Sequence, residues 1–479
     1  MAGSRPNVLW YCTDQQRFDT IGALGNPHVH TPNLDRLVRE GVAFTHAYCQ
    51  APICTPSRAS FLTGRYPSTI GVNANGNTWF PADETLVTRR LVDAGYEAGL
   101  AGKLHLAGAY NGREPRTDDG YSFFQYSHAP RDDWPRGHDY AEWLRAQGED
   151  AAFHLNKPSR PFGADVPAPD KDNVPPHLHQ TTWCSEQAIR FIEGERESGT
   201  PWLLSVNPYD PHPPYNPPWE YFQRFDPDSL PGPHFRESDL AHQATLAGTD
   251  FQTEAMRPDA LDGNGGRTVQ ALYYAMIEQV DEQFGRILDS LDETGQRENT
   301  VIVFMSDHGE ALGDHGLAHK GARFFDGLSR VPLMCSWPGH FETGLVSDAL
   351  VGLLDVAPTL LEIAGMPVPE SMQGKSLLPI LTGDASPDHH RDFVRCEYRD
   401  AVDLPDQTFA TMYRERRWKL INYHGLSRGE LYDMENDPHE FTSLWDDPEY
   451  AEVKTELLIK SFDATVAAEE FGARRAMPY

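Results

Sequence analysis

The chain has 479 residues, enough for one large domain and a smaller one, and its 10 Trp, 19 Tyr and 23 Phe provide ample material for packed cores. Its 71 Asp and Glu outnumber its 41 Lys and Arg, which gives a formal net charge of −30 that repels nucleic acids and anionic lipids at long range. Binding to nucleic acid is therefore disfavoured, and no run of about 18 apolar residues predicts a membrane span.

The start of the chain and its cysteines predict a cytoplasmic protein. The segment MAGSRPNVLWYC passes from one Arg directly to an apolar run, without the apolar segment and cleavage site of a secretion signal. Cysteines scattered over a long chain fit reduced thiols better than a disulfide framework, and they are Cys12, Cys49, Cys54, Cys184, Cys335 and Cys396.

Strands and helices alternate along most of the chain. The apolar run 7–12 is typical of a buried strand, and Thr31 and Pro32 predict the capped start of a helix that ends at Gly41. The same alternation continues with a helix over 85–94, strands over 96–102 and 202–206, an amphipathic helix over 272–291 and a strand over 301–305. The pattern predicts an α/β fold with a large, mostly parallel sheet sandwiched by helices.

Two long segments, roughly 109–180 and 213–267, lack this period and are expected to be insertions that build a site or an interface. Aromatic residues in and next to them are candidates either for an aromatic binding surface or for ordinary packing: Tyr110, Trp134, Tyr209, Tyr215, Trp219 and Tyr221.

The pattern changes near residue 385. Short strands over 393–398, 410–413 and 418–423 and a closing helix after Pro448, with Leu458 and Phe462 on one face, predict an antiparallel sheet plus a helix. We therefore expect a catalytic α/β domain over residues 1–385 and a C-terminal α+β subdomain over residues 386–479.

The most informative stretch is CTPSRASFLTGR, residues 54–65. Thr55 as cap, Pro56 at the first helical position and Gly64 as stop place Cys54 at the mouth of a short helix, with Arg58 beside it. A thiol at a helix N-terminus next to a guanidinium has a lowered pKa, which favours a reactive nucleophile over an inert buried cysteine.

This stretch resembles the signature of the type I, formylglycine-dependent sulfatases of the alkaline-phosphatase-like superfamily: C-x-P-x-R followed by L-T-G-R. The resemblance implies that a maturation enzyme converts Cys54 to formylglycine. It further implies that one hydroxyl of the hydrated aldehyde binds a divalent metal ion and attacks sulfur, and that collapse to the aldehyde later expels sulfate.

The resemblance also implies the metal ligands. Asp14 and Gln15 follow the first strand, Asp307 and His308 follow the strand over 301–305, and Cys54 completes the set. Gln15 and His308 stand where many family members carry Asp and Asn. Oxygen donors favour Ca²⁺, and the softer imidazole keeps Mn²⁺ and Mg²⁺ as alternatives.

Fixed cations and proton-transfer groups follow from matching family elements. Arg58, Lys103 and Lys320 are expected to face the sulfate ester, Lys103 and His105 forming a G-K-x-H element. His212 matches a second family histidine, and with Lys320 it is expected to protonate the departing alcohol, while His105 acts on the other hydroxyl of the hydrate.

The leading hypothesis is a cytoplasmic sulfatase that hydrolyses small sulfate monoesters, with aryl sulfates as plausible substrates. Hydrolysis of phosphonate monoesters or phosphodiesters is the alternative, since relatives with the same nucleophile and with Asp-Gln and Asp-His ligand pairs do this chemistry. A non-catalytic scaffold that keeps only the fold is disfavoured because every catalytic position is filled. A homo-oligomer is also expected.

Overall fold

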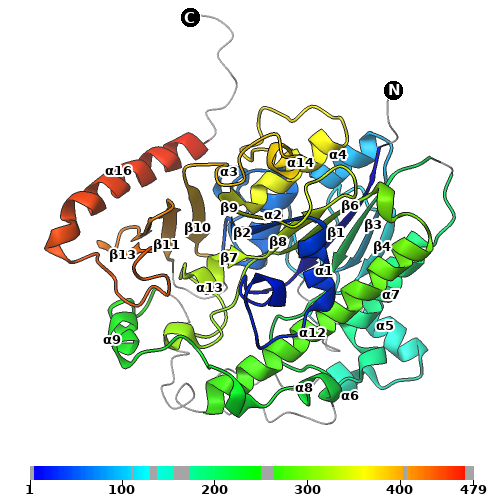
Figure 1. Ribbon diagram of the computed structural model, residues 1–479, viewed down its shortest axis with the longest axis horizontal. Coiled ribbons are helices and arrows are strands. Elements are labelled where there is room, and N and C mark those ends of the chain that lie inside the picture. The colour runs from blue at the N-terminus through cyan, green and yellow to red at the C-terminus, as the bar shows by residue number, and fades with distance from the viewer. Residues whose placement is uncertain are drawn as a thin grey trace, which may run out of the picture.

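The computed structural model describes residues 5–109, 112–129, 138–155, 173–197, 199–249, 264–402 and 407–469. Figure 1 shows a central twisted sheet with helices on both faces, and a smaller sheet beside it that is covered by the long helix near the C-terminus. The predicted fold class is confirmed. Tyr110 and Trp134, named above as candidate surface aromatics, lie outside the described residues.

Among the described residues, nine strands form the large sheet in the order β4-β3-β5-β1-β6-β8-β2-β7, with β9 paired to β2. The strands are β1 (Asn7–Thr13), β2 (Val42–Tyr48), β3 (Glu97–Gly102), β4 (Phe123–Tyr126), β5 (Trp202–Asn207), β6 (Thr300–Ser306), β7 (Arg330–Val331), β8 (Leu333–Ser336) and β9 (Leu345–Gly352). Strands β4, β3, β5, β1 and β6 run parallel to one another, as does β9 to β2, whereas β8 and β7 pair antiparallel with their neighbours.

The C-terminal sheet is antiparallel throughout, in the order β10-β11-β12-β13. Its strands are β10 (Val394–Arg399), β11 (Phe409–Arg414), β12 (Trp418–Tyr423) and β13 (Arg428–Asp433). The helices of the described chain are α1 (Pro32–Glu40), α2 (Cys54–Thr63), α3 (Pro67–Ile70), α4 (Val87–Asp93), α5 (Asp139–Ala146), α6 (Ala151–Leu155), α7 (Gln180–Ile192), α8 (Trp219–Phe222), α9 (Glu237–Thr245), α12 (Asn264–Glu293), α13 (Asp326–Ser329), α14 (Val356–Ile363), α15 (Leu378–Leu381) and α16 (Ala451–Ala468).

Strand β1 shows why the sheet carries helices on both faces. Its seven residues are all buried, because successive side chains point to opposite faces and both faces are covered. Val8 and Trp10 pack in the cluster that includes Ala59 and Phe61 of α2. Leu9 and Tyr11 pack in the opposite cluster with side chains of α1, α7 and α12. Helices α2 and α14 therefore cover one face, and α1, α7 and α12 cover the other (Figure 1).

Three local predictions are wrong or incomplete. Thr31 does not cap α1; its Oγ1 instead accepts a hydrogen bond from Gly22 N and donates to Asp35. Leu458 and Phe462 of α16 line the same surface cavity, as expected for one face, but Phe462 is 68% exposed and Leu457 and Ala464 form the buried side of the helix. Strands β2, β4, β7, β8, β9 and β13 were not predicted. Strands β4, β7 and β8 have only two to four residues, and β2 pairs with β7, β8 and β9, which lie far from it in sequence. Strand β13 forms a hairpin with β12.

The predicted division at residues 385 and 386 stays a prediction. Within the described chain, no helix is long and apolar enough to span a membrane.

Candidate active site

The carboxyl ends of four neighbouring strands bring the site together. Strands β1 and β6 pair in register up to Thr13 and Ser306, so the residues that follow both strands become neighbours. Accordingly, Gln15 N donates a 3.0 Å hydrogen bond to Asp307 Oδ1. Strand β5 lies between β1 and β3, which brings the loops after β5 and β3, with His212 and Lys103, to the same edge.

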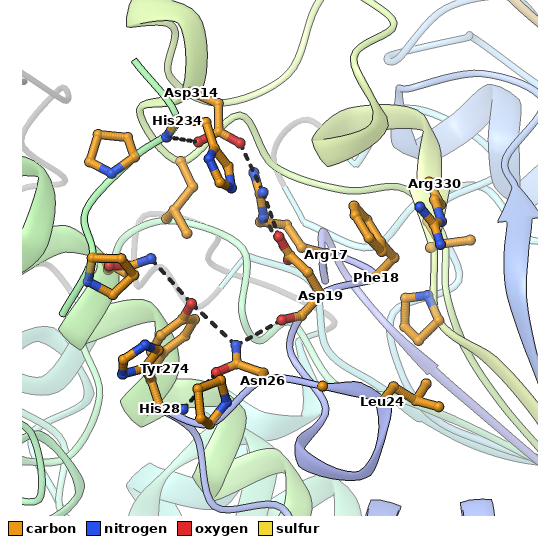
Figure 2. Close-up of a pocket in the computed structure, with 18 of the residues that line it drawn as sticks. Arg17, Phe18, Asp19, Leu24, Asn26, His28, His234, Tyr274, Asp314 and Arg330 are labelled. Carbon is orange, nitrogen blue, oxygen red and sulfur yellow. Dashed lines mark hydrogen bonds and ion pairs between the residues drawn. The ribbon is translucent and has the colours of Figure 1, made fainter. Parts of the chain in front are cut away.

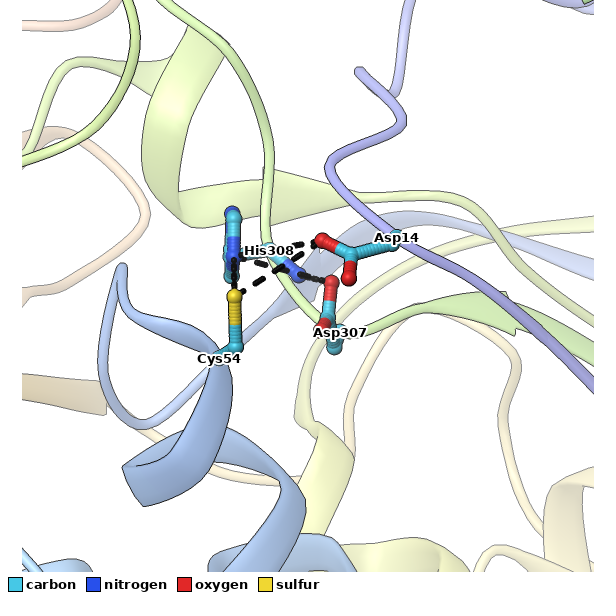
Figure 3. Close-up of side chains that lie close together, drawn as sticks. All are labelled: Asp14, Cys54, Asp307 and His308. Atoms are coloured by element: carbon cyan, nitrogen blue, oxygen red, sulfur yellow. Dashed lines mark hydrogen bonds and ion pairs between the residues drawn. The ribbon is translucent and has the colours of Figure 1, made fainter. Parts of the chain in front are cut away.

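Cys54 approaches this edge from α2. Its Sγ lies 2.8 Å from Lys320 Nζ, 3.2 Å from His308 Nε2 and 3.7 Å from Asp14 Oδ1. Figure 3 shows Cys54 pointing from the start of its helix toward Asp14, Asp307 and His308. The predicted nucleophile and the predicted ligand pairs therefore meet in one buried cluster.

Helix α2 starts two residues earlier than predicted. Cys54 is itself the first helical residue, and the capping position falls on Ile53, whose side chain makes no capping bond. Thr55 N instead donates a 2.9 Å hydrogen bond to Asn75 Oδ1. At the other end, Gly64 closes the helix in the left-handed conformation at φ 70°, as predicted.

One group of donors fits a divalent cation. The ligand atoms of Asp14, Cys54, Asp307 and His308 all lie within 4.8 Å of one another. His308 Nδ1 lies 2.9 Å from the carbonyl oxygen of Gly309, which orients the ring and leaves Nε2 toward the carboxylates. Two carboxylates, an imidazole and the nearby Gln15 amide form a donor set that suits a hard or borderline cation.

Arg58 and Lys103 balance the buried carboxylates. Arg58 Nε lies 2.8 Å from Asp307 Oδ2 and its Nη2 lies 3.6 Å from Asp14 Oδ2. Lys103 Nζ forms a short ion pair with the same Asp14 oxygen. The carbonyl oxygen of Lys103 accepts hydrogen bonds from Arg58 Nη1 at 3.1 Å and from Asn207 Nδ2 at 2.7 Å, which ties these elements together.

The cations lower the pKa values of the groups they surround. Burial raises the pKa of the Cys54 thiol, but Lys103, Lys320 and His308 outweigh it and hold that pKa well below its ordinary value. Burial and Cys54 act to raise the pKa of Asp14, and Lys103 again prevails and lowers it. The site therefore stabilises negative charge at Cys54 and Asp14 despite the acidity of the whole chain.

The loop that carries His105 is fixed by hydrogen bonds to one buried carboxylate. Its backbone is left-handed at φ 57°, an unusual conformation for a side chain with a Cβ. The buried carboxylate of Glu114 accepts hydrogen bonds from the backbone N–H groups of His105 at 2.6 Å, Leu106 at 2.7 Å and Ala107 at 3.0 Å. Burial and Lys103 lower the pKa of His105 to about 4, so its imidazole is neutral near pH 7.

A series of rings lines the other side of the cluster. His105 and His128 meet edge to face with centroids 4.4 Å apart, and Tyr209 and His212 lie 4.4 Å apart. Lys103 Nζ lies 5.3 Å from the centroid of the Tyr209 ring. Burial and Lys320 lower the pKa of His212, and its Nδ1 lies 2.6 Å from the carbonyl oxygen of Pro213.

The remaining aromatic candidates have a structural role. Tyr215 and Tyr221 are buried in a cluster with α12 side chains, and the partly buried Trp219 packs against it. Packing, rather than an aromatic binding surface, accounts for these three.

A separate cavity has a volume of about 400 Å³. Figure 2 shows side chains that line it, among them Arg17, Asp19 and Asp314. Arg17 lies in it between Asp19 at 2.7 Å and Asp314 at 2.8 Å, so its charge is paired locally. The residues that line this cavity include none of the predicted site residues.

Sequence reasoning assigned no site role to Glu114, His128, Tyr209 or Glu310. The Oε2 of Glu310 accepts a short hydrogen bond from Gln15 Nε2. The position of Glu310 could have suggested a role, because it lies in the same segment as Asp307 and His308. Glu114 and His128 lie in a segment without period, and only the folded chain brings them to the edge of the sheet.

The chain matches the Sulfatase family over residues 6–366 and the C-terminal family of N-sulphoglucosamine sulphohydrolase over residues 313–465. An arylsulfatase of Clostridium perfringens is 30% identical, with 94% of this chain and 92% of the relative covered. A multifunctional alkaline phosphatase superfamily protein of Trinickia caryophylli is 30% identical, with 94% and 93% covered. The phosphonate monoester hydrolase structure of Agrobacterium radiobacter has a TM-score of 0.82 and 28% identity, with 97% and 96% covered.

Proposed function

The chain belongs to the sulfatase family, and we infer that this sulfuric ester hydrolase cleaves small sulfate monoesters, with aryl sulfates among its substrates. One observation carries the inference: Cys54, at the first position of α2, lies within hydrogen-bond distance of Lys320 and beside the carboxylates that pair with Arg58 and Lys103. A sulfate ester needs such fixed cations, because negative charge develops on its leaving oxygen.

We propose that Cys54 is converted to formylglycine by a maturation enzyme and that Asp14, Gln15, Asp307 and His308 hold one divalent cation beside it. When bound, the cation polarises the ester and the hydrated aldehyde at position 54 supplies the nucleophile. Ca²⁺ is our first choice because oxygen donors predominate, and the imidazole of His308 makes Mn²⁺ or Mg²⁺ the alternatives.

The other side chains bind the ester and move protons. Arg58, Lys103 and Lys320 neutralise the sulfate group. His105, neutral near pH 7, accepts a proton from the hydroxyl that remains on residue 54. His212 and Lys320 donate the proton that the departing alcohol takes up.

Phosphonate monoesters and phosphodiesters are the second candidate substrates. The similarity to the Agrobacterium radiobacter phosphonate monoester hydrolase favours them. We rank them second because Lys103, His105 and Lys320, which suit a sulfate ester, are all present at the cluster.

Initial rates on 4-nitrophenyl sulfate, a phenylphosphonate monoester and bis(4-nitrophenyl) phosphate test this order. We expect the highest kcat/KM on the sulfate. A sulfate rate far below the other two would reverse the order, without affecting the proposed nucleophile.

Peptide mass tests the nucleophile itself. Conversion of Cys54 to formylglycine lowers the mass of its peptide by about 18 Da. We expect this shift in active protein, and loss of turnover in Cys54→Ser, because a serine sulfate has no aldehyde to which it can collapse. Active protein with an unmodified Cys54, or near-native turnover in Cys54→Ser, would contradict the mechanism.

We further propose a cytoplasmic location and a homo-oligomeric state. All six cysteines are buried free thiols, which supports a reducing compartment. Cell fractionation and light scattering of the purified protein test these two proposals.

A further inference from the structure

Both polar atoms of the Gln15 side-chain amide have a hydrogen-bond partner. Its Nε2 donates a short hydrogen bond to Glu310 Oε2, and its Oε1 accepts a 2.9 Å hydrogen bond from Lys320 Nζ. A carboxylate cannot donate and an ammonium cannot accept, so these partners determine which end of the amide carries the oxygen. The oxygen therefore lies on the side of Cys54, because Lys320 Nζ is 2.8 Å from its Sγ.

Glu310 uses both of its carboxylate oxygens as acceptors. Oε1 accepts a 3.1 Å hydrogen bond from Leu312 N, and Oε2 accepts the bond from Gln15. The main chain of Glu310 is fixed as well, since its N–H donates to Gly327 O at 2.9 Å and its carbonyl accepts from Arg17 Nη1 at 2.9 Å. An amide at position 310 could satisfy only one of the two donors that the carboxylate now satisfies.

The acceptor role of Glu310 also restricts position 15. Gln15 and Glu310 are both fully buried, so a carboxylate at position 15 would face that of Glu310 within hydrogen-bond distance. A carboxylate has no N–H to donate, so Glu310 Oε2 would lose the donor that the Gln15 amide now supplies. This hydrogen bond therefore favours an amide over a carboxylate at position 15.

We propose that Glu310 is a positioning residue for the metal site: it selects an amide at position 15 and holds the amide oxygen on the side of Cys54, where it would be available to a bound cation. Residues 15 and 310 are then a matched pair in which one donates and the other accepts. This inference rests on the ligand set proposed above.

The pair allows an isosteric exchange as a test. We compare wild type with Gln15→Glu, Glu310→Gln and the double variant, each stripped with chelator and titrated calorimetrically with Ca²⁺ and, in parallel, Mn²⁺. Each single variant should bind the preferred cation at least about tenfold more weakly. The double variant should return to within about threefold of wild type, because the amide introduced at 310 donates to position 15 and still accepts from Leu312 N.

The exposed Glu362→Gln in α14 removes the same charge away from the site and should leave affinity unchanged. Thermal unfolding of every variant shows whether it is folded. Wild-type affinity in Glu310→Gln, or a double variant no better than the weaker single variant, would overturn the pairing while leaving the proposed metal site intact. A wild type that binds neither cation would overturn both.

Discussion

At the scale of residues, the site concentrates buried charge that stability alone would not favour. Asp14, Asp307, Arg58 and Lys103 are almost fully inaccessible to solvent. Burying charges costs several kcal/mol per ion, and well-packed apolar residues would stabilise the same space at least as well. Buried charges of this kind are expected at functional sites, where the cations among them can bind an anionic substrate.

His212 gives the sharpest prediction at this scale. Its Nδ1 contacts the carbonyl oxygen of Pro213, so the protonated ring has its transferable proton on Nε2. We expect His212→Ala to lower kcat on an alkyl sulfate by at least about 100-fold and to affect 4-nitrophenyl sulfate much less, because only the poor leaving group requires a proton. Steady-state kinetics on both esters measures the difference. Equal losses on the two esters would assign proton donation to Lys320.

At the scale of elements, the position of the nucleophile depends on α2. All ten of its residues are buried, so this helix is part of the core at the same time as it presents Cys54. Gly64 ends it in the left-handed region, and the Gly64 carbonyl accepts hydrogen bonds from Gln373 N at 2.8 Å and Gly374 N at 2.9 Å. The end of α2 is therefore attached to the segment that follows α14.

Gly64 and Gly71 form a matched pair for testing this attachment. Both close a helix at nearly the same φ, 70° and 73°, but a Cβ would lie 3.2 Å from Met372 at Gly64 and meet nothing within 4 Å at Gly71. We expect Gly71→Ala to lower the free energy of unfolding by about 1–2 kcal/mol, the cost of the left-handed conformation, and Gly64→Ala to lower it further. Urea denaturation measures both; equal losses would show that Met372 moves aside without cost.

At the scale of the whole molecule, buried ion pairs join the two sheets. Lys419 of β12 contacts Asp326 of α13 at 2.8 Å and Glu440 at 2.7 Å. A second contact joins α9, from the long insertion, to β13 through His242 Nε2 and Glu430 Oε1 at 2.7 Å. The C-terminal sheet is therefore fixed against the part of the chain that carries Lys320.

The ion pair between His242 and Glu430 should stabilise the fold only within a limited pH range. Burial acts to raise the pKa of Glu430, but the bond from His242 lowers it from 4.5 to about 2, so its stabilisation is present above about pH 4.5 and lost as the pH falls. Burial acts to lower the pKa of His242, but Glu430 raises it above 6.5, so its stabilisation is present below 6.5 and lost at higher pH. The pair should contribute fully between about pH 4.5 and 6.5.

A double-mutant cycle of His242→Gln and Glu430→Gln tests this window. We expect a coupling free energy of about 1–3 kcal/mol near pH 5.5 and less at pH 3 and pH 9, from unfolding experiments at each pH. A coupling free energy that is constant across these pH values would show that His242 and Glu430 form a neutral contact and not an ion pair.

The sequence predicted Cys54 as the nucleophile and the Asp14–Gln15 and Asp307–His308 pairs as ligands through its resemblance to the sulfatases, and it predicted the parallel strands that precede the two pairs. Asp14 and Asp307 each follow a strongly apolar strand, which short-range signals reveal, but only the resemblance to the sulfatases identified these two residues as candidate ligands. The order of nine strands, the antiparallel β7 and β8 and the exposure of Phe462 depend on contacts between distant segments.

The neighbours of these residues follow from the tertiary structure and not from any local pattern. Glu114, which binds the backbone of the His105 loop, and His128, beside the His105 ring, lie in a segment without period or motif, and nothing local shows that Glu310 binds the Gln15 amide. A local sequence pattern indicates secondary structure and candidate functional side chains within one segment. The partners that orient those side chains come from other strands and loops, and burial, charge balance and hydrogen-bond satisfaction select them once the chain has folded.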